Sequence, residues 1–213
     1  NGATAQITSS GGNVSVTGMG TGSGASDYNS GIEINEGTIT AGGSGSVTVI
    51  GTGGITTGVL NDGVLVVAGT ITSNNGAVSV TGTGGGTGIS AYNYGIEAVS
   101  NGTITAGGNG AVTVQGTGGA ANGEDNFGVY LQGAQITSSG GNVNVTGQGG
   151  GLSSSATNIG VLLSNTGVIS AGGAGTVTVS GTGGATLGHN NQGVRVTGAS
   201  SAITSSGGNV SVT

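Results

Sequence analysis

The 213-residue chain contains no cysteine, no proline and no tryptophan, and its few charged side chains are a single basic one, Arg195, and seven acids. The lack of cysteine excludes both a disulfide scaffold and a thiolate metal site. Nucleic-acid binding needs clustered Lys and Arg, so no nucleic-acid partner is expected. A membrane-spanning helix needs about 20 consecutive apolar residues. Here Gly, Ser, Thr or Asn interrupts every apolar run, so no membrane insertion is expected.

Glycine is the residue in excess, with 54 positions. A collagen triple helix would need glycine at every third position together with proline, and neither is found. Disorder driven by charge is excluded because the chain has so few charged residues. The composition therefore calls for a periodic structure.

The chain is a tandem repeat. The segment Ile7–Val16 returns nearly unchanged around Ile136 and Ile203, and weaker copies lie between them. The equivalent isoleucines are Ile7, Ile39, Ile71, Ile104, Ile136, Ile169 and Ile203, separated by 32, 32, 33, 32, 33 and 34 residues. Alternate copies differ in a regular way, which indicates a duplicated pair of repeats as the underlying unit.

Each repeat carries three short apolar segments, such as Ile32–Ile34, Thr38–Thr40 and Val14–Val16. In all three, apolar residues alternate with polar or variable ones, and most are Val, Ile or Thr, which is typical of strands with one buried face. No segment shows helical periodicity, and glycine is too frequent for a stable helix. Three strands per repeat and no helix are therefore expected.

Strands this short bury their apolar face only when successive repeats stack. The sequence thus predicts an all-β parallel β-helix (a β-solenoid) over residues 1–213, right-handed by extension of the crossover rule, with about 32–33 residues per turn and about seven turns. A register of two 16-residue turns per repeat is less favoured, because the second half has too few apolar residues. The isoleucine column forms one face of the core. Both ends interrupt a repeat without a polar cap, which predicts a window of a longer array or a unit that stacks end to end.

One asparagine precedes the glycine that opens the first strand of each repeat. The set is Asn29, Asn61, Asn93, Asn126, Asn158 and Asn191. Stacked amides can hydrogen-bond to one another and to turn backbone, and asparagine tolerates left-handed backbone. We interpret the column as a structural asparagine ladder, with ligand binding along that edge as the less favoured alternative.

The acids do not form a catalytic pattern. Glu33 and Glu97 occupy equivalent strand positions two turns apart, without a basic partner, and are expected to be solvated. A calcium-binding nonapeptide would need Asp where this chain has core valines such as Val47; a surface calcium at Glu124 and Asp125 stays an alternative. His189 has no partner for a triad. No enzyme activity, cofactor or metal is expected.

Two surface features are candidates for binding. Threonine pairs such as Thr38/Thr40 resemble the arrays of ice-binding solenoids, but the array breaks at Val168 and Ala202, so ordinary outward strand residues are favoured. The aromatic residues beside the asparagines are the candidate surface contacts, for sugars or proteins, although covering the corner is the simpler role. They are Tyr28, Tyr92, Tyr94 and Phe127.

The segment Gly11–Gly18 and the Asn-x-Gly-Val/Ile pattern resemble the β-strand repeat arrays of bacterial surface proteins, including filamentous-haemagglutinin-like adhesins and autotransporter passengers. The resemblance covers the whole chain. It implies a structural, secreted protein at the bacterial surface or in a biofilm matrix: a rod, a filament or an adhesin stalk. Its partners would be other copies or a longer chain. The alternative is an adhesive module whose glycine-rich loops recognise carbohydrate, and the remote ones are ice binding and polysaccharide degradation.

Overall fold

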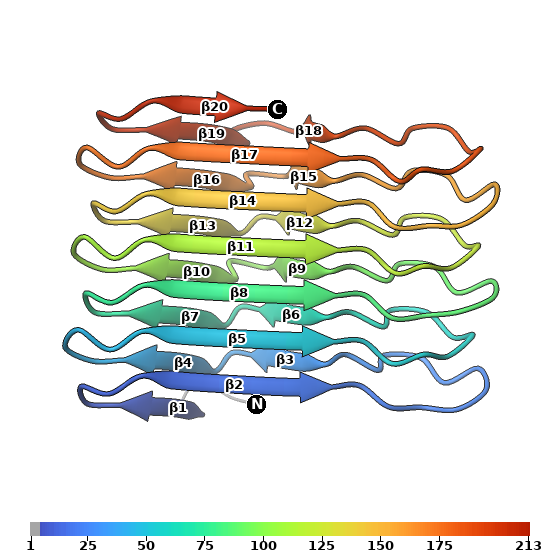
Figure 1. The fold of residues 1–213 in the computed structure, drawn as a ribbon, viewed down its shortest axis with the longest axis horizontal. Coiled ribbons are helices and arrows are strands. Elements are labelled where there is room, and N and C mark those ends of the chain that lie inside the picture. Colours follow the sequence, from blue (N-terminus) through green and yellow to red (C-terminus); the bar gives the residue numbers. More distant parts are fainter. Residues whose placement is uncertain (1–4) are drawn as a thin grey trace.

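The computed structural model describes residues 5–213, and the first four residues of the expected array lie outside this range. The described residues form twenty strands and no helix. The strands make three parallel sheets, called A, B and C, that run the length of the molecule (Figure 1). An all-β solenoid, as the periodicity predicts, is confirmed.

The strands follow one another in the order A, B, C through each repeat. Sheet A contains β1 (Gln6–Ser9), β4 (Thr38–Ala41), β7 (Thr70–Ser73), β10 (Thr103–Ala106), β13 (Gln135–Ser138), β16 (Val168–Ala171) and β19 (Ala202–Ser205). Sheet B contains β2 (Val14–Met19), β5 (Val47–Thr52), β8 (Val78–Thr83), β11 (Val112–Thr117), β14 (Val143–Gln148), β17 (Val177–Thr182) and β20 (Val210–Val212). Sheet C contains β3 (Ile32–Asn35), β6 (Val64–Val67), β9 (Ile96–Val99), β12 (Val129–Gln132), β15 (Val161–Ser164) and β18 (Val194–Val196).

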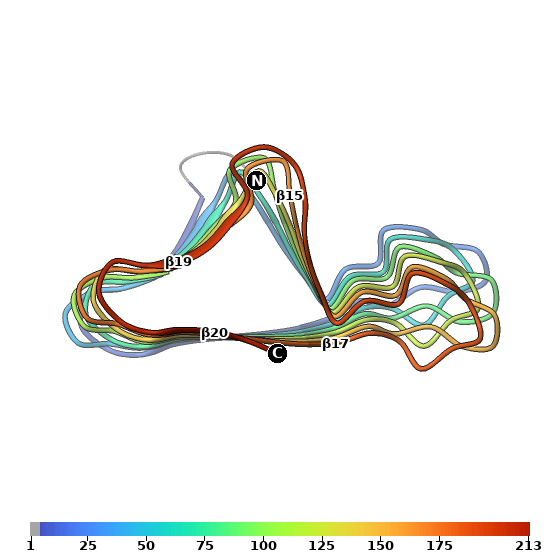
Figure 2. The same cartoon turned by 90° about the horizontal axis from the view of Figure 1, so that it is seen from above.

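Equivalent residues of successive repeats pair directly, as Ile39 does with Ile71 in sheet A and Val47 with Val78 in sheet B. Seen along the axis, the three sheets form the sides of a triangle, and the turns superimpose closely (Figure 2). The chain winds in the right-handed sense, because it runs anticlockwise in this view while rising toward the viewer. One repeat makes one turn, so the alternative of two short turns per repeat is wrong.

The solenoid has about six turns, whereas seven were expected. The expectation counted seven isoleucines, and sheet A does contain seven strands. Sheet C contains only six, because the described chain starts at sheet A and stops at sheet B. The seventh isoleucine therefore belongs to a turn that is not completed within these residues.

Aliphatic side chains from all three sheets fill the triangle. The isoleucines from Ile71 to Ile169 in the sheet A column are fully buried, and Val49 and Val66 face them from sheets B and C. At the two ends of the described stack, Ile7 is 49% exposed and Ile203 is partly buried against the core. The β-branched residues thus form continuous columns, since each one repeats at the same position of the next turn.

The glycine-rich segment between sheets B and C leaves the triangle as a long loop, on the right of Figure 2. Two backbone segments cross closely at its base, which we call the neck. A Cβ on Gly116 of β11 would lie 2.0 Å from the carbonyl oxygen of Gly128, so a side chain is excluded there. The loops also stack, since the N–H of Gly85 donates to the carbonyl of Asn61 at 2.7 Å. The loop is therefore an ordered extension of each turn.

The sharp corner between sheets A and B alternates from turn to turn. Ser73 and Ser138 each donate a hydroxyl hydrogen bond to the backbone carbonyl three residues ahead, at Gly76 and Gly141. The turn between them has Ala106 at the equivalent position. This alternation matches the pair of repeats inferred from the sequence.

Candidate functional site

The six asparagines lie in one column at the neck, where the loop returns to sheet C. Each Nδ2 group donates to Oδ1 of the asparagine in the next turn: Asn29 to Asn61 at 2.9 Å, Asn61 to Asn93 at 3.0 Å, Asn93 to Asn126 at 2.8 Å, Asn126 to Asn158 at 3.3 Å and Asn158 to Asn191 at 3.1 Å. The four central side chains are completely buried. A buried amide ladder of this kind has its polar atoms paired within the protein and has no open face for a ligand.

Backbone groups complete the hydrogen bonding of the column. The Asn93 N–H donates to Oδ1 of Asn126 at 3.3 Å, and Nδ2 of Asn126 donates to the carbonyl of Gly123 at 2.7 Å. No buried side-chain nitrogen or oxygen atom among residues 5–213 lacks a partner. The column therefore holds the segment of each loop that returns to sheet C against the next turn.

The residue three positions before each ladder asparagine alternates between serine and glycine. In the central turns the hydroxyl of Ser90 donates to the Gly58 carbonyl on one side, and Gly123 approaches from the other. A Cβ on Gly123 would lie 2.2 Å from the carbonyl oxygen of Ser90. A turn with serine at this position can therefore be followed only by a turn with glycine there.

The residue directly before each asparagine adopts left-handed backbone. The six are Tyr28, Leu60, Tyr92, Asp125, Thr157 and Asn190, with φ between 56° and 59°. This conformation costs an L-residue about 1–2 kcal/mol. The N–H groups of the first five pair across turns, as that of Leu60 does with the carbonyl of Ala91 at 3.2 Å. The strain is retained because the asparagine column and the stacked loops fix the backbone on both sides.

The four aromatic candidates divide into two groups. Tyr28 and Tyr92 are 73% and 38% exposed, so they remain available as surface contacts. Tyr94 and Phe127 are only 6% exposed each, so the expectation that they form a surface contact is wrong. Their rings stack with centroids 5.0 Å apart, and Tyr130 on β12 meets both edge-on. They cover the outer face of sheet C, where the loop arm packs against it.

A buried acid pair lies beside this aromatic cluster. Asp62 follows the ladder residue Asn61 and is 1% exposed, and its Oδ1 accepts the backbone N–H of Tyr94 at 2.9 Å. Its carboxyl is hydrogen-bonded to that of Glu97 on β9. Two carboxyls can share a hydrogen bond only when one is protonated. Burial raises the pKa of Asp62 well above its usual range and raises the pKa of Glu97 to about 7.

The acid pair was not found from the sequence. Glu97 was expected to be solvated like Glu33, because both point outward from sheet C. Glu33 is exposed and accepts a hydrogen bond from Asn35 at 3.3 Å, whereas Glu97 is largely covered. Leu65 separates the two glutamates. The missed signal is that Asp62 shares its repeat position with Tyr94 and Phe127, which are aromatic and therefore mark a covered site.

A groove of about 500 Å³ lies among the outer loops of four successive turns. Its lining includes Ala91, Asn122, Glu124, Ser154 and His189. Burial, together with the neighbouring Glu124 carboxylate, raises the pKa of Asp125 to about 6. These polar side chains can donate and accept hydrogen bonds, but they do not form a catalytic arrangement.

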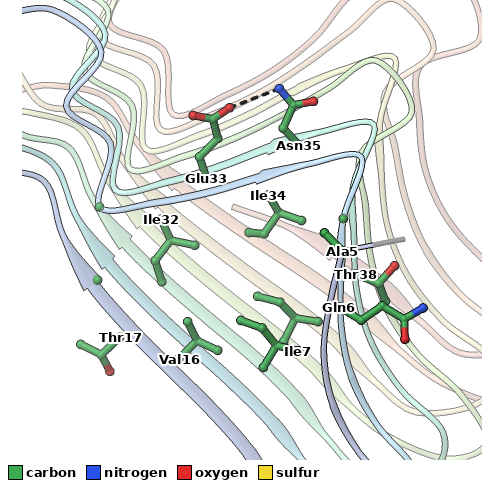
Figure 3. A pocket seen from close by; sticks show the side chains of 14 residues that line it. Ala5, Gln6, Ile7, Val16, Thr17, Ile32, Glu33, Ile34, Asn35 and Thr38 are labelled. Carbon is green, nitrogen blue, oxygen red and sulfur yellow. Dashed lines mark hydrogen bonds between the residues drawn. The ribbon is translucent and has the colours of Figure 1, made fainter. Parts of the chain in front are cut away.

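A second hollow, of about 430 Å³, lies at the first described turn. In Figure 3, Ile7, Val16, Ile32 and Ile34 point into it, while Glu33 points away toward Asn35. These aliphatic residues belong to the core columns. The hollow is therefore the open end of the core and not a separate binding site.

Among residues 5–213, no group of three or more acidic or histidine side chains is placed to hold a metal ion. The same residues include no helix of the length and apolarity required to cross a membrane. Comparison with known proteins gives no match to any protein family, any curated protein or any solved structure.

Proposed function

We propose that the chain is a structural repeat protein that forms an extended rod, as a filament or an adhesin stalk outside a bacterial cell. The observation that carries the proposal is the uniformity of the turns. Sheets A and B keep the same pairing register from β1 to β19 and from β2 to β20. A recognition site would instead interrupt the array with atypical turns.

Such a rod acts through its length, which grows with each added turn. Each turn adds about 4.8 Å of length, the spacing of hydrogen-bonded strands. The three ladders and the asparagine column contribute the same contacts at every step, so lengthening the rod needs no new kind of interaction. The chain has no lysine and one arginine, which leaves a single cleavage site for proteases that cut after basic residues.

The resemblance to β-strand repeat arrays of bacterial surface proteins supports an extracellular location. Such arrays hold functional segments away from a cell surface, and a stiff, repetitive chain suits that role. We extend the proposal to the absence of enzymatic activity, because the buried acid pair of Asp62 and Glu97 lines neither groove.

An adhesive module is the second candidate. The groove at the loop tips favours it, because residues from three turns contribute polar groups, and exposed Tyr92 lies on a neighbouring loop position. Sugars bind through hydrogen bonds combined with stacking on aromatic rings. The loops vary between repeats, whereas the sheets do not.

Negative-stain electron microscopy of the native protein tests the rod. Rods of constant width, with a 4.8 Å axial repeat in diffraction, are the expected result. Compact particles without an axial repeat would contradict the proposal. A glycan-array measurement with wild-type protein and a Tyr92→Ala variant tests the second candidate, which predicts binding that the variant weakens.

A further inference from the structure

The charged residues are segregated on one side of the solenoid. All seven acids and Arg195 lie in the loops, in sheet C or at the corner between sheets C and A. The strands of sheets A and B and the corners that join them contain no charged residue. The net charge of −6 is therefore confined to one side of the triangle.

The outer surface of sheet B, which we call face B, is made of short uncharged side chains in three columns. Its centre includes Thr81, Thr113, Gln115 and Thr146, all at least partly exposed. Threonine has a restricted χ1 angle, so these side chains lose little freedom on contact. Met19 and Ile50 add exposed apolar surface, at 73% and 42% exposure.

Face B is also flat and large enough for a stable contact. Its strands superimpose as nearly one straight line along the base of the triangle in Figure 2. A complete strand spans six residues and the sheet has seven strands, which gives about 20 Å by about 29 Å, or about 600 Å² per copy. Two copies would bury about 1,200 Å², above the roughly 1,000 Å² that a specific interface needs. The four-residue strands of sheet A give only about two thirds of that area.

We infer that face B is a self-association surface, through which two copies of the chain pack side by side. The inference rests on the proposed rod and adds lateral pairing to it. A second copy fits because the surface is complementary to itself: threonine and serine hydroxyls both donate and accept hydrogen bonds, so identical faces can satisfy each other.

The charge distribution also favours face B over the other faces as the contact between two copies. Two molecules of net charge −6 repel each other. Face-to-face contact through sheet B keeps every charged side chain out of the contact, because the charges lie in the loops, in sheet C and at the corner between sheets C and A. No charged group loses water on contact, so the association should change little with salt concentration.

The test compares two variants with the same added charge. Thr81→Lys with Thr146→Lys adds two charges to face B, and Thr40→Lys with Gln132→Lys adds two to sheets A and C. All four side chains are at least partly exposed. Sedimentation equilibrium at several salt concentrations measures association, and circular dichroism checks the fold of each variant.

Wild type and the control variant should associate reversibly, with a dissociation constant that changes little between low and high salt. The face B variant should associate at least about tenfold more weakly, because each lysine would have to be buried without a partner. The inference would be overturned if the wild type stays monomeric up to about 1 mM. It would also be overturned if the two variants associate equally strongly.

A second measurement does not depend on the lysine variant folding. The chain has no cysteine, so Gln115→Cys places a single spin label at the centre of face B, and Gln132→Cys places one on sheet C. Short distances between labels on different molecules are expected only for Gln115→Cys, and equal long distances would contradict lateral pairing.

The outcomes also separate this inference from the proposed function. Single rods of constant width would overturn lateral pairing but leave the rod in place, whereas compact particles would overturn both. If the wild type stays monomeric but sediments with ice or with a crystalline polysaccharide, face B has a different occupant. That result would overturn self-association.

Discussion

Asn93 donates from Nδ2 to Oδ1 of Asn126 at 2.8 Å, and neither side chain reaches solvent. Its Oδ1 accepts hydrogen bonds from Nδ2 and from the backbone N–H of Asn61, at 3.0 and 3.3 Å. One amide thus joins three successive turns at the neck. Removing it would take the acceptor from the buried Asn61 N–H and one hydrogen bond from each neighbouring side chain.

Asn93→Ala should lower the free energy of unfolding by at least about 2 kcal/mol, because a buried group left without its hydrogen bond costs about 1–3 kcal/mol. Urea denaturation followed by circular dichroism measures the change. Asn144→Ala on the exposed face of β14 is the matched control and should change it by less than about 0.5 kcal/mol. Similar losses in both variants would show that the ladder does not stabilise the fold.

The acid pair should make stability depend on pH. The folded pKa of Glu97 is about 7, above its usual 4.5, so the folded protein binds more protons than the unfolded chain between these values. Stability from the protonated pair is therefore complete below about pH 4.5 and is lost as the pH rises through about 7. The urea midpoint should fall over this range.

Glu97→Gln should flatten this pH profile, since an amide can donate to Asp62 at every pH. Glu33→Gln, at the equivalent exposed position two turns earlier, should leave the profile unchanged. A steep profile that persists in Glu97→Gln would assign the pH dependence to other groups, first to Asp62, whose own burial raises its pKa, and then to Asp125, with a pKa of about 6.

Gly116→Ala should prevent normal closure of the neck. The added Cβ would lie 2.0 Å from the Gly128 carbonyl oxygen, so one backbone segment must move. Overpacking of this kind costs about 1–3 kcal/mol or more. Gly11→Ala, where a Cβ meets nothing within 4 Å, should fold like wild type. Soluble yield and thermal unfolding compare the two, and a normal melting temperature for Gly116→Ala would contradict the close approach.

Ile104→Ala should lower the free energy of unfolding by about 2–5 kcal/mol, the usual range for an aliphatic side chain removed from a closed core. Ile104 is fully buried, whereas Ile89 in the loop is 81% exposed. Ile89→Ala should therefore have little effect in the same urea titration. Equal sensitivity at the two positions would indicate that the triangle is not the principal core.

The period of the sequence was sufficient to predict the turns, the three sheets and the isoleucine column, because each depends on neighbouring repeats alone. The path of the loop was not predictable in the same way. Glycine marks where backbone segments approach closely, but it does not show which surface the loop will cover. For that reason Tyr94 and Phe127 stayed candidate surface contacts, and Glu97 was expected in solvent, although the returning arm covers all three.

The serine–glycine alternation beside the asparagine column determines how an array of this kind can change in length. Loss or gain of two repeats keeps the alternation, because each turn with serine, such as that of Ser90 or Ser155, still has a turn with glycine beside it. Loss of one glycine-bearing repeat sets serine against serine, where the close approach of Gly123 to Ser90 leaves no room for a side chain. Loss of one serine-bearing repeat sets glycine against glycine and removes a hydroxyl hydrogen bond between turns. Recombination between repeats should therefore be tolerated in steps of two turns, so that related genes would differ by even numbers of repeats.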